Sequence, residues 1–381
     1  MKITFIRTST NAVGEYRMRH PAVALSRMGH QCNLLTLNQK VTRVANVELE
    51  SDVLVLQRQT SLDSIRLRDT LPVRPVTVYE LDDNPWEMHS WDTIHAELGF
   101  EYGKLSREVM AACDAVTCST PFLAMRVRKE FPRMPIWVVP NAIDLTIRDW
   151  ERKEDRAEFD LQDKVVLGWT GSIHHTRDGQ QMLQALPELF NAYPDLVFLM
   201  QCDRCVYYPW TQPLVKQGFG DRLRWVPPLP FDIHPAIYSL FDVNLAPLEN
   251  TPFNQCKSDL RLIEGGAHGV PYVASRVAPY LEFDRQSGGI GGMLADSPRE
   301  WVDAIDDILT QREARGQSLQ RYVRQTRSLE AIAPVWETAF RAAMERGTGE
   351  RIRPLGDLTR NSPCPCGSEQ KYKRCCAPAY G

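Results

Sequence analysis

Short apolar segments rich in β-branched residues alternate with helix-like segments along most of this 381-residue chain. In the first half, such segments lie at 2–7, 32–37, 53–57, 76–81, 115–119 and 136–140. Buried strands that are almost continuously apolar, with helices between them, are typical of a parallel sheet covered on both faces. The alternation restarts at 165 and continues to 275. The sequence therefore predicts an α/β protein with two Rossmann-like, doubly wound domains.

The mostly charged segment 146–163 is interpreted as the linker between the two domains. Helices are expected near 21–28, 210–217, 258–268 and 298–311, and a long final helix near 319–344. The expected organisation is a first domain at 1–145, the linker at 146–163, a second domain at 164–318, a helix at 319–346 that packs back on the first domain, a polar segment at 347–360 and a tail at 361–381.

Two successive doubly wound domains bring the carboxyl ends of both sheets to a shared cleft. Ligands bind there because loops and helix N-termini converge, with the positive ends of the helix dipoles exposed. This arrangement predicts an anion-binding site between the halves.

Composition excludes several classes of protein. The formal net charge of -3 gives no global electrostatic case for nucleic-acid binding. The start, MKITFIRTST, is too short for a signal-peptide core, and no run of about 18 apolar residues is present. Six scattered cysteines in a large chain without an export signal favour free thiols. We expect a cytoplasmic protein without a transmembrane segment, and peripheral contact with a membrane stays open.

The segment FNQCKSDLRLIEGGAHGVPYVAS (253–275) carries the strongest signal in the second domain. Lys257 and Ser258 are expected at a helix N-terminus, where a lysine is electrostatically awkward unless it faces an anion. Glu264 follows seven residues later, about two helical turns on, and its carboxylate can accept hydrogen bonds from both ribose hydroxyls. The alternative interpretation is an ordinary amphipathic surface helix.

The segment GWTGSIHHTRD (168–178) follows an expected strand and precedes an expected helix. Gly168 and Gly171 permit a tight turn, and Gly171 and Ser172 offer N–H and hydroxyl donors to phosphate. A glycine turn after a strand is common, so this segment supports a phosphate site only in combination with the other motif.

These segments, together with RTSTNAVGEYRMRHP (7–21), YELDDNPW (79–86) and VVPNAID (138–144), resemble a retaining, family-four-type glycosyltransferase of GT-B architecture. The likeness extends over about residues 1–345, with the motifs in the family's order. The resemblance implies transfer of a hexosyl group from a nucleotide-sugar donor, with retention and without a catalytic metal.

The resemblance also implies roles for single residues. Lys257 and Ser258 would hold the donor diphosphate, Glu264 its ribose, and Arg17 would help to neutralise the leaving group. The remaining implied contacts are Gly14, Gly171 and Ser172 at the donor, Asn141 and Asp144 at the hinge, and His89 as the catalytic histidine, with His20 as a second choice.

One position departs from the family's pattern, because Cys256 stands where the first of two spaced glutamates is usual. That glutamate usually contacts the sugar, so Cys256 is the candidate sugar contact here. The pair Asp82-Asp83 resembles a divalent-metal motif, but we interpret it as the end of a strand.

The C-terminal segment NSPCPCGSEQKYKRCC (361–376) predicts a structural zinc site formed by Cys364, Cys366, Cys375 and Cys376. Four thiolates complete a tetrahedral zinc shell and leave no open position, and metal binding would supply the folding energy of so short a segment. The segment resembles the SEC-C motif, which implies a tail that docks on a protein partner.

The leading hypothesis is therefore a glycosyltransferase that uses a nucleotide-sugar donor and a glycan, lipid-linked or protein acceptor. Two alternatives remain. One is a nucleotide-sugar epimerase with the same architecture. The other is a degenerate transferase that acts as a binding or scaffold protein through its zinc tail, which the cysteine at position 256 supports.

Overall fold

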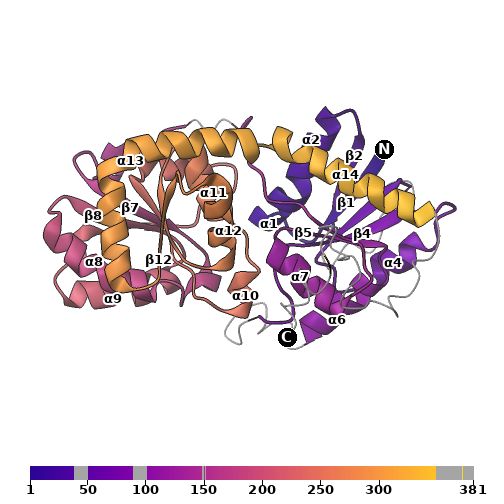
Figure 1. Ribbon diagram of the computed structural model, residues 1–381, viewed down its shortest axis with the longest axis horizontal. Coiled ribbons are helices and arrows are strands. Elements are labelled where there is room, and N and C mark those ends of the chain that lie inside the picture. The colour runs from indigo at the N-terminus through magenta and orange to yellow at the C-terminus, as the bar shows by residue number, and fades with distance from the viewer. Residues whose placement is uncertain (38–49, 89–100, 148–149, 151, 349–370, 372–381) are drawn as a thin grey trace.

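The structure is a computed structural model that describes residues 1–37, 50–88, 101–147, 150, 152–348 and 371. Two α/β halves lie side by side and are bridged along one edge by long helices (Figure 1). Each half contains a six-stranded sheet in which every pair of neighbouring strands is parallel. The prediction of two doubly wound parallel sheets is confirmed.

The first sheet has the strand order β2-β1-β3-β4-β5-β6. Its strands are β1 (Lys2–Arg7), β2 (Gln31–Thr36), β3 (Val53–Gln57), β4 (Val76–Leu81), β5 (Ala115–Cys118) and β6 (Ile136–Val138). All five residues of β3 are buried, as the covering of both faces of a parallel sheet requires. The strand order reverses between β1 and β3, and ligands of such sheets bind at the carboxyl ends beside this reversal.

The helix after β1 starts much earlier than expected. Asn11 caps α1 (Ala12–Gly14), which runs through a π-helical turn, η1 (Glu15–Arg19), into α2 (His20–Arg27). Pro21 lies in the first turn of α2, after the π-helical turn, and so does not end the helix. The other helices of this half are α4 (Asp63–Arg68), α6 (Glu101–Ala111) and α7 (Pro121–Glu130).

The second sheet has the strand order β12-β11-β10-β7-β8-β9, which reverses between β7 and β10. Its strands are β7 (Val165–Thr170), β8 (Leu196–Gln201), β9 (Leu223–Val226), β10 (Val243–Ala246), β11 (Tyr272–Ser275) and β12 (Gly292–Ala295). Its helices are α8 (Gln180–Ala192), α9 (Arg204–Lys216), the 3-10 helix η6 (His234–Leu240), α10 (Pro252–Gln255), α11 (Leu260–Ala267) and α12 (Ala278–Ser287). The helix expected at 258–268 is observed as α11, which begins two residues later and ends one residue earlier, whereas α10, α12 and β12 were not expected.

Two chain segments cross between the halves beside each other. The Ile143 N–H donates to the Arg327 carbonyl at 2.8 Å, and the Leu329 N–H donates to the Ile143 carbonyl at 3.0 Å. The second crossing is the break between α13 (Pro298–Thr326) and α14 (Leu329–Thr348), rather than the start of a helix at 319. The break carries Arg327, whose buried guanidinium pairs with Asp259.

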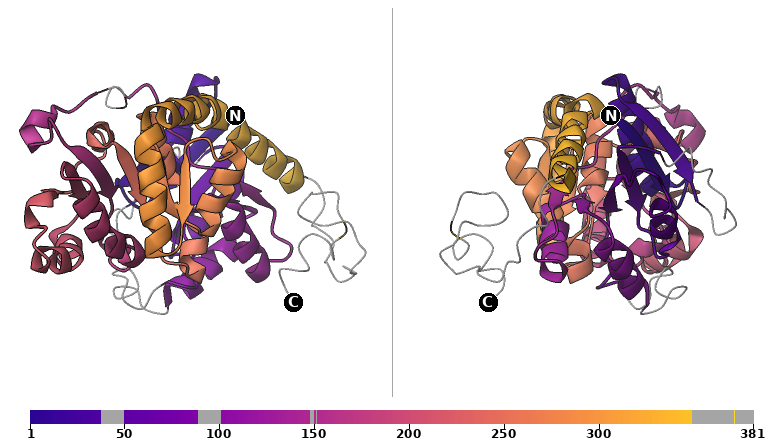
Figure 2. Two further views of the ribbon diagram at one scale, coloured as in Figure 1. Left: turned by 60° about the vertical axis from the view of Figure 1, so that its left-hand side comes forward. Right: turned by 90° about the vertical axis from the view of Figure 1, so that its right-hand side faces the viewer.

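Helix α14 packs on the first half, as Figure 2 shows from two further sides. Phe340 meets Phe5 of β1 edge to face, with ring centroids 6.1 Å apart, and Trp336 lies 5.0 Å from the Arg17 guanidinium. The apolar side of α14 thus belongs to the core of the first half. No helix in the described ranges is both long and apolar enough to span a bilayer.

Helix α13 continues through 312–318, where the sequence suggested a break between two helices, and Gly316 lies in this stretch. A Cβ atom at this position would lie 2.0 Å from the carbonyl oxygen of Gly269, which precedes β11. The absence of a side chain therefore allows the helix backbone to pack directly on the backbone of the sheet connection.

We expect Gly316→Ala to destabilise the protein, by about 1–3 kcal/mol as in other overpacked sites. The sign is informative, because alanine in place of glycine inside a helix ordinarily stabilises by up to about 1 kcal/mol. Urea unfolding of the two chains measures the difference. Gly220→Ala is the matched control, since a Cβ atom there meets nothing within 4 Å. A more stable Gly316→Ala chain would show that the close backbone contact is absent.

Candidate functional site

Arg17 is buried inside the first half. Its guanidinium donates to Glu80 Oε1 at 2.7 Å, to the Val139 carbonyl at 2.7 Å and to Asn141 Oδ1 at 3.0 Å. The residue is only 1% exposed. Burial raises the pKa of Glu80 to about 7, although the Arg17 charge opposes this rise. The Nε and Nη1 donors are therefore engaged in the interior, whereas Nη2 is buried without a partner. The expected role of Arg17 at the leaving group stays a prediction.

Gly14 lies at the start of the same helix, where the chain leaves β1. A Cβ atom here would lie 2.0 Å from the Ser9 carbonyl oxygen, so the loop before the helix packs directly on its first turn. Tyr16, two residues further on, contacts the second half.

Tyr16 hydrogen-bonds to Glu264 across the two halves. Its hydroxyl donates to Glu264 Oε1 at 2.6 Å, and the Tyr238 hydroxyl of η6 donates to Oε2 at 2.8 Å. A carboxylate offers about four lone-pair sites, two on each oxygen. The two tyrosines occupy one site on each oxygen, so one acceptor site on each remains. Glu264 is buried, and His234 Nε2 lies 4.0 Å from its Oε1 atom. A carboxylate with one free acceptor site on each oxygen can accept from two hydroxyl groups, such as those of a ribose.

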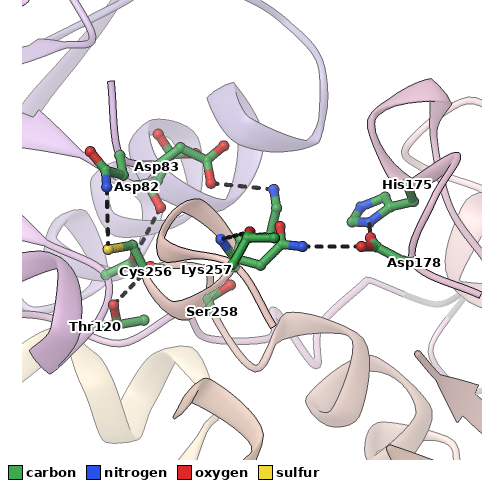
Figure 3. A network of polar contacts seen from close by, with 12 residues as sticks. Asp82, Asp83, Thr120, His175, Asp178, Cys256, Lys257 and Ser258 are labelled. Atoms are coloured by element: carbon green, nitrogen blue, oxygen red, sulfur yellow. Dashed lines mark hydrogen bonds and ion pairs between the residues drawn. The ribbon is translucent and has the colours of Figure 1, made fainter. Parts of the chain in front are cut away.

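Lys257 lies between α10 and α11, so it does not share a helix with Glu264 as expected. Its Nζ atom lies 3.4 Å from Asp83 Oδ1 of the first half and 4.6 Å from the centre of the Phe253 ring. Figure 3 shows Lys257 between the Asp82-Asp83 pair on one side and His175 and Asp178 on the other. The ammonium group thus faces the boundary between the halves.

Asp82 and Asp83, which follow β4, both pair with cations. Arg58 lies 3.2 Å from each carboxylate, and its backbone is left-handed, with φ of 47°, which is strained for a residue with a side chain. Burial raises the pKa of Asp82, whereas for Asp83 the charges of Lys257 and Arg58 outweigh burial and lower the pKa. In the described part of the chain, no three His, Cys, Asp or Glu side chains are placed to hold a metal ion.

Cys256 is buried against the first half. Its thiol accepts a hydrogen bond from the Asn84 amide at 3.7 Å, and its carbonyl accepts one from the Thr120 hydroxyl at 2.9 Å. Burial raises the pKa of this thiol to about 12, so it is protonated at neutral pH. The side chain therefore supplies no anionic oxygen where the family usually has a glutamate.

The loop after β7 carries the other predicted phosphate residues. A Cβ atom on Gly171 would lie 2.2 Å from the Trp169 ring, and Ser172 is exposed just before a short 3-10 helix (Ile173–His175). His175 Nδ1 lies 2.6 Å from Asp178 Oδ2, and Asp178 Oδ1 accepts from the Glu249 N–H at 2.9 Å. This loop is thereby tied to the loop that follows β10.

Arg261 was missed by the sequence interpretation. It lies one helical turn before Glu264 on α11, and its guanidinium lies 5.5 Å from the Trp169 ring centre. Its Nη1 atom is buried and has no hydrogen-bond partner. The spacing of three residues from Glu264 was the signal that could have identified it, since residues three apart on a helix are neighbours.

The remaining candidates lie near the crossing or outside the described residues. Asn141 Nδ2 donates to Ser258 Oγ at 2.9 Å, and Asp144 accepts from the Thr146 hydroxyl at 2.6 Å. His20 is buried, and burial lowers its pKa to about 4. The predicted catalytic His89 and the four cysteines at 364, 366, 375 and 376 lie outside the described residues.

The surroundings of His175 predict a pH effect on stability. Burial lowers the pKa of His175 to about 4, and the nearby Arg261 charge adds to the effect, whereas an unfolded histidine titrates near ~6.5. The unfolded chain therefore takes up this proton first. The stability that neutral His175 contributes is complete above about pH 6.5 and is lost as the pH falls toward 4.

We expect His175→Gln to flatten the dependence of the unfolding free energy on pH between about 6.5 and 4, by up to about 1.4 kcal/mol per pH unit. Urea denaturation at several pH values measures this slope. His174→Gln controls for the loss of a ring from the same loop. Parallel curves for the parent and His175→Gln would contradict the lowered pKa.

Comparison with known proteins is consistent with this geometry. Residues 164–311 match the family Glycosyl transferases group 1, and residues 360–378 match the SEC-C motif. The chain is 25% identical to D-inositol 3-phosphate glycosyltransferase of Geodermatophilus obscurus over 274 residues, which cover 66% of this chain and 59% of that protein. The chain spans about half the length of the curated relatives it matches.

Solved structures share the whole two-domain arrangement. HepE of Anabaena, in complex with UDP and glucose, superposes with a TM-score of 0.66 at 13% identity and covers 90% of this chain and 100% of its own. Sucrose-phosphate synthase of Thermosynechococcus elongatus gives 0.68 at 15% identity, with 91% and 100% covered. The fold is therefore GT-B.

Proposed function

Because this chain is a GT-B protein with a group 1 glycosyltransferase domain and a C-terminal SEC-C motif, we propose that it transfers a sugar from a nucleoside-diphosphate sugar to an acceptor. The observation that carries the proposal is that Glu264 and the Lys257 ammonium group both contact the first half, and that Arg261 lies one turn before Glu264 on α11. These groups lie where the order of the second sheet reverses, which is the ligand site of this fold.

The cations suit the chemistry of the leaving group. When the bond from the sugar to the diphosphate breaks, negative charge develops on the nucleoside diphosphate, and fixed positive groups stabilise it. Lys257 pairs with Asp83 and would exchange that carboxylate for the phosphate oxygens of a bound donor. Transfer is proposed to retain the anomeric configuration and to need no catalytic metal, since Asp82 and Asp83 are already balanced by cations.

Two substitutions test the donor site. We expect Lys257→Ala to lower kcat for donor turnover by roughly 100- to 1,000-fold, as removal of one fixed charge-stabilising group does elsewhere.

We expect Glu264→Gln to weaken the preference for UDP over 2′-deoxy-UDP from about tenfold or more to less than about threefold, because an amide offers fewer acceptor sites. UDP, GDP and ADP sugars serve as the donor panel, with calorimetry for binding and chromatography for products.

Lys216→Ala, at an exposed position on α9, is the matched control for the lysine substitution. Normal turnover by Lys257→Ala would contradict the proposed role of this residue. Binding of a donor without turnover in the parent would favour the scaffold alternative, and a changed donor sugar formed without an acceptor would favour the epimerase alternative.

We also propose that the SEC-C segment binds one zinc ion through Cys364, Cys366, Cys375 and Cys376. The donor set fits zinc, since four thiolates complete a tetrahedral shell and leave no position open for catalysis. The bound ion would fold this segment, which is too short to form a core of its own. The basic side chains between the cysteine pairs would then present a docking surface to a protein partner.

Measurements of zinc content and of donor turnover together distinguish a structural zinc ion in the tail from a metal ion needed for catalysis. We expect one zinc per chain by elemental analysis in the parent and none in a variant with all four tail cysteines replaced by serine. Donor turnover by that variant should equal that of the parent and should be unchanged by a chelator. Loss of turnover when the chelator is added to the variant would contradict the proposal that catalysis needs no metal.

A further inference from the structure

Asp178 joins the two loops that meet at the reversal of the second sheet. Its Oδ1 atom accepts from the Glu249 N–H at 2.9 Å and from the Asn254 amide at 3.0 Å, both in the connection after β10. Its Oδ2 atom lies 2.6 Å from His175 Nδ1 in the loop after β7. The carboxylate is buried, so these contacts fix its position (Figure 3). His175 is thus held at the ligand edge of the sheet.

This arrangement selects one tautomer of His175. An ionised carboxylate only accepts hydrogen bonds, so Nδ1 must carry the proton that faces Asp178. The charges of Arg261 and Lys257, together with burial, oppose a second proton on the ring. Nε2 is therefore an unprotonated acceptor, on a side chain that remains 15% exposed.

An unprotonated ring nitrogen repels phosphate oxygens and needs a hydrogen-bond donor. The diphosphate has its own cationic partners in Lys257 and Arg261, whereas the sugar supplies hydroxyl groups, which are donors. Cys256 is not available to bind them, because it is buried and its thiol faces Asn84 of the first half. His175 remains as an oriented acceptor near Lys257.

We propose that His175, oriented by Asp178, accepts a hydrogen bond from a hydroxyl group of the donor's sugar and thereby helps to determine which sugar the site accepts. This inference rests on the proposed function. His175 would touch the donor, and Asp178 would be a positioning residue that acts through the tautomer of the ring.

Asp178→Asn is the sharpest test, because asparagine can keep Oδ1 for Glu249 and Asn254 while its amide donates to His175 Nδ1. The proton then moves to Nε2, which becomes a donor. Nitrogen-15 NMR of labelled histidine shows directly which ring nitrogen carries the proton. If Asp178 only stabilised the fold, the Asp178→Asn substitution would leave this tautomer unchanged. The probes are UDP, GDP and ADP alone, and UDP-glucose, GDP-mannose and ADP-glucose, measured by calorimetry.

We expect Asp178→Asn and His175→Asn each to lower, by about tenfold, the affinity for the sugar nucleotide that the parent binds. The affinity for the matching nucleoside diphosphate should change by less than about threefold. Deoxy analogues of that donor should locate the hydroxyl, since one position should lose affinity in the parent and not in the variants. Asp221→Asn, exposed in the same half, is the matched control. Thermal melting identifies a variant that does not fold. In that case the sugar-nucleotide affinity of the other variant decides whether the inference holds.

The outcomes separate the two proposals. Unchanged sugar affinity in a folded variant, with the tautomer shifted or the ring removed, would overturn this inference and leave the proposed function intact. Failure of the parent to bind any of the three nucleoside diphosphates would overturn the proposed function and this inference with it.

Discussion

The paired crossing of the chain at Ile143 and Ser328 fixes how the two sheets face each other. Two backbone hydrogen bonds join these segments, and the buried Arg327 guanidinium ties the second crossing to Asp259, directly before α11. The orientation of α11 is therefore coupled to the hinge itself. Two contacts between the halves depend on this fixed orientation: Tyr16 with Glu264, and Asp83 with Lys257.

Charge balance explains much of what lies at the boundary between the halves. A cation removed from water is stable only beside an anion, and the benefit of such a pair depends on both partners being present. Lys257 has Asp83 as its partner, and the first half thus supplies a carboxylate where a bound diphosphate would supply phosphate oxygens. Arg261 has a buried nitrogen without any partner, which is a cost that an anionic ligand would remove.

The architecture could be predicted from the sequence, whereas side-chain roles could not. Apolar strands such as 53–57 and 76–81 were placed at their observed bounds, because the hydrophobic period fixes them locally. Helix α13 was predicted to be interrupted near Gly316. The glycine is needed there because the backbone of Gly269, distant in sequence, packs against it, and the sequence alone does not reveal this contact. The burial of Arg17 against Glu80 could not be predicted, because the two residues are distant in sequence and no local pattern reveals the pair.

Cys256 illustrates why a motif position alone does not define a role. Its neighbours include Asn84, whose amide also donates to Glu87 at 2.7 Å, and Asp83 lies close enough to raise the thiol pKa further. A glutamate at this position would add a third carboxylate to Asp83 and Glu87, and like charges at short range disfavour ionisation. A small neutral side chain is what these surroundings accommodate. The first half and position 256 are therefore matched to each other.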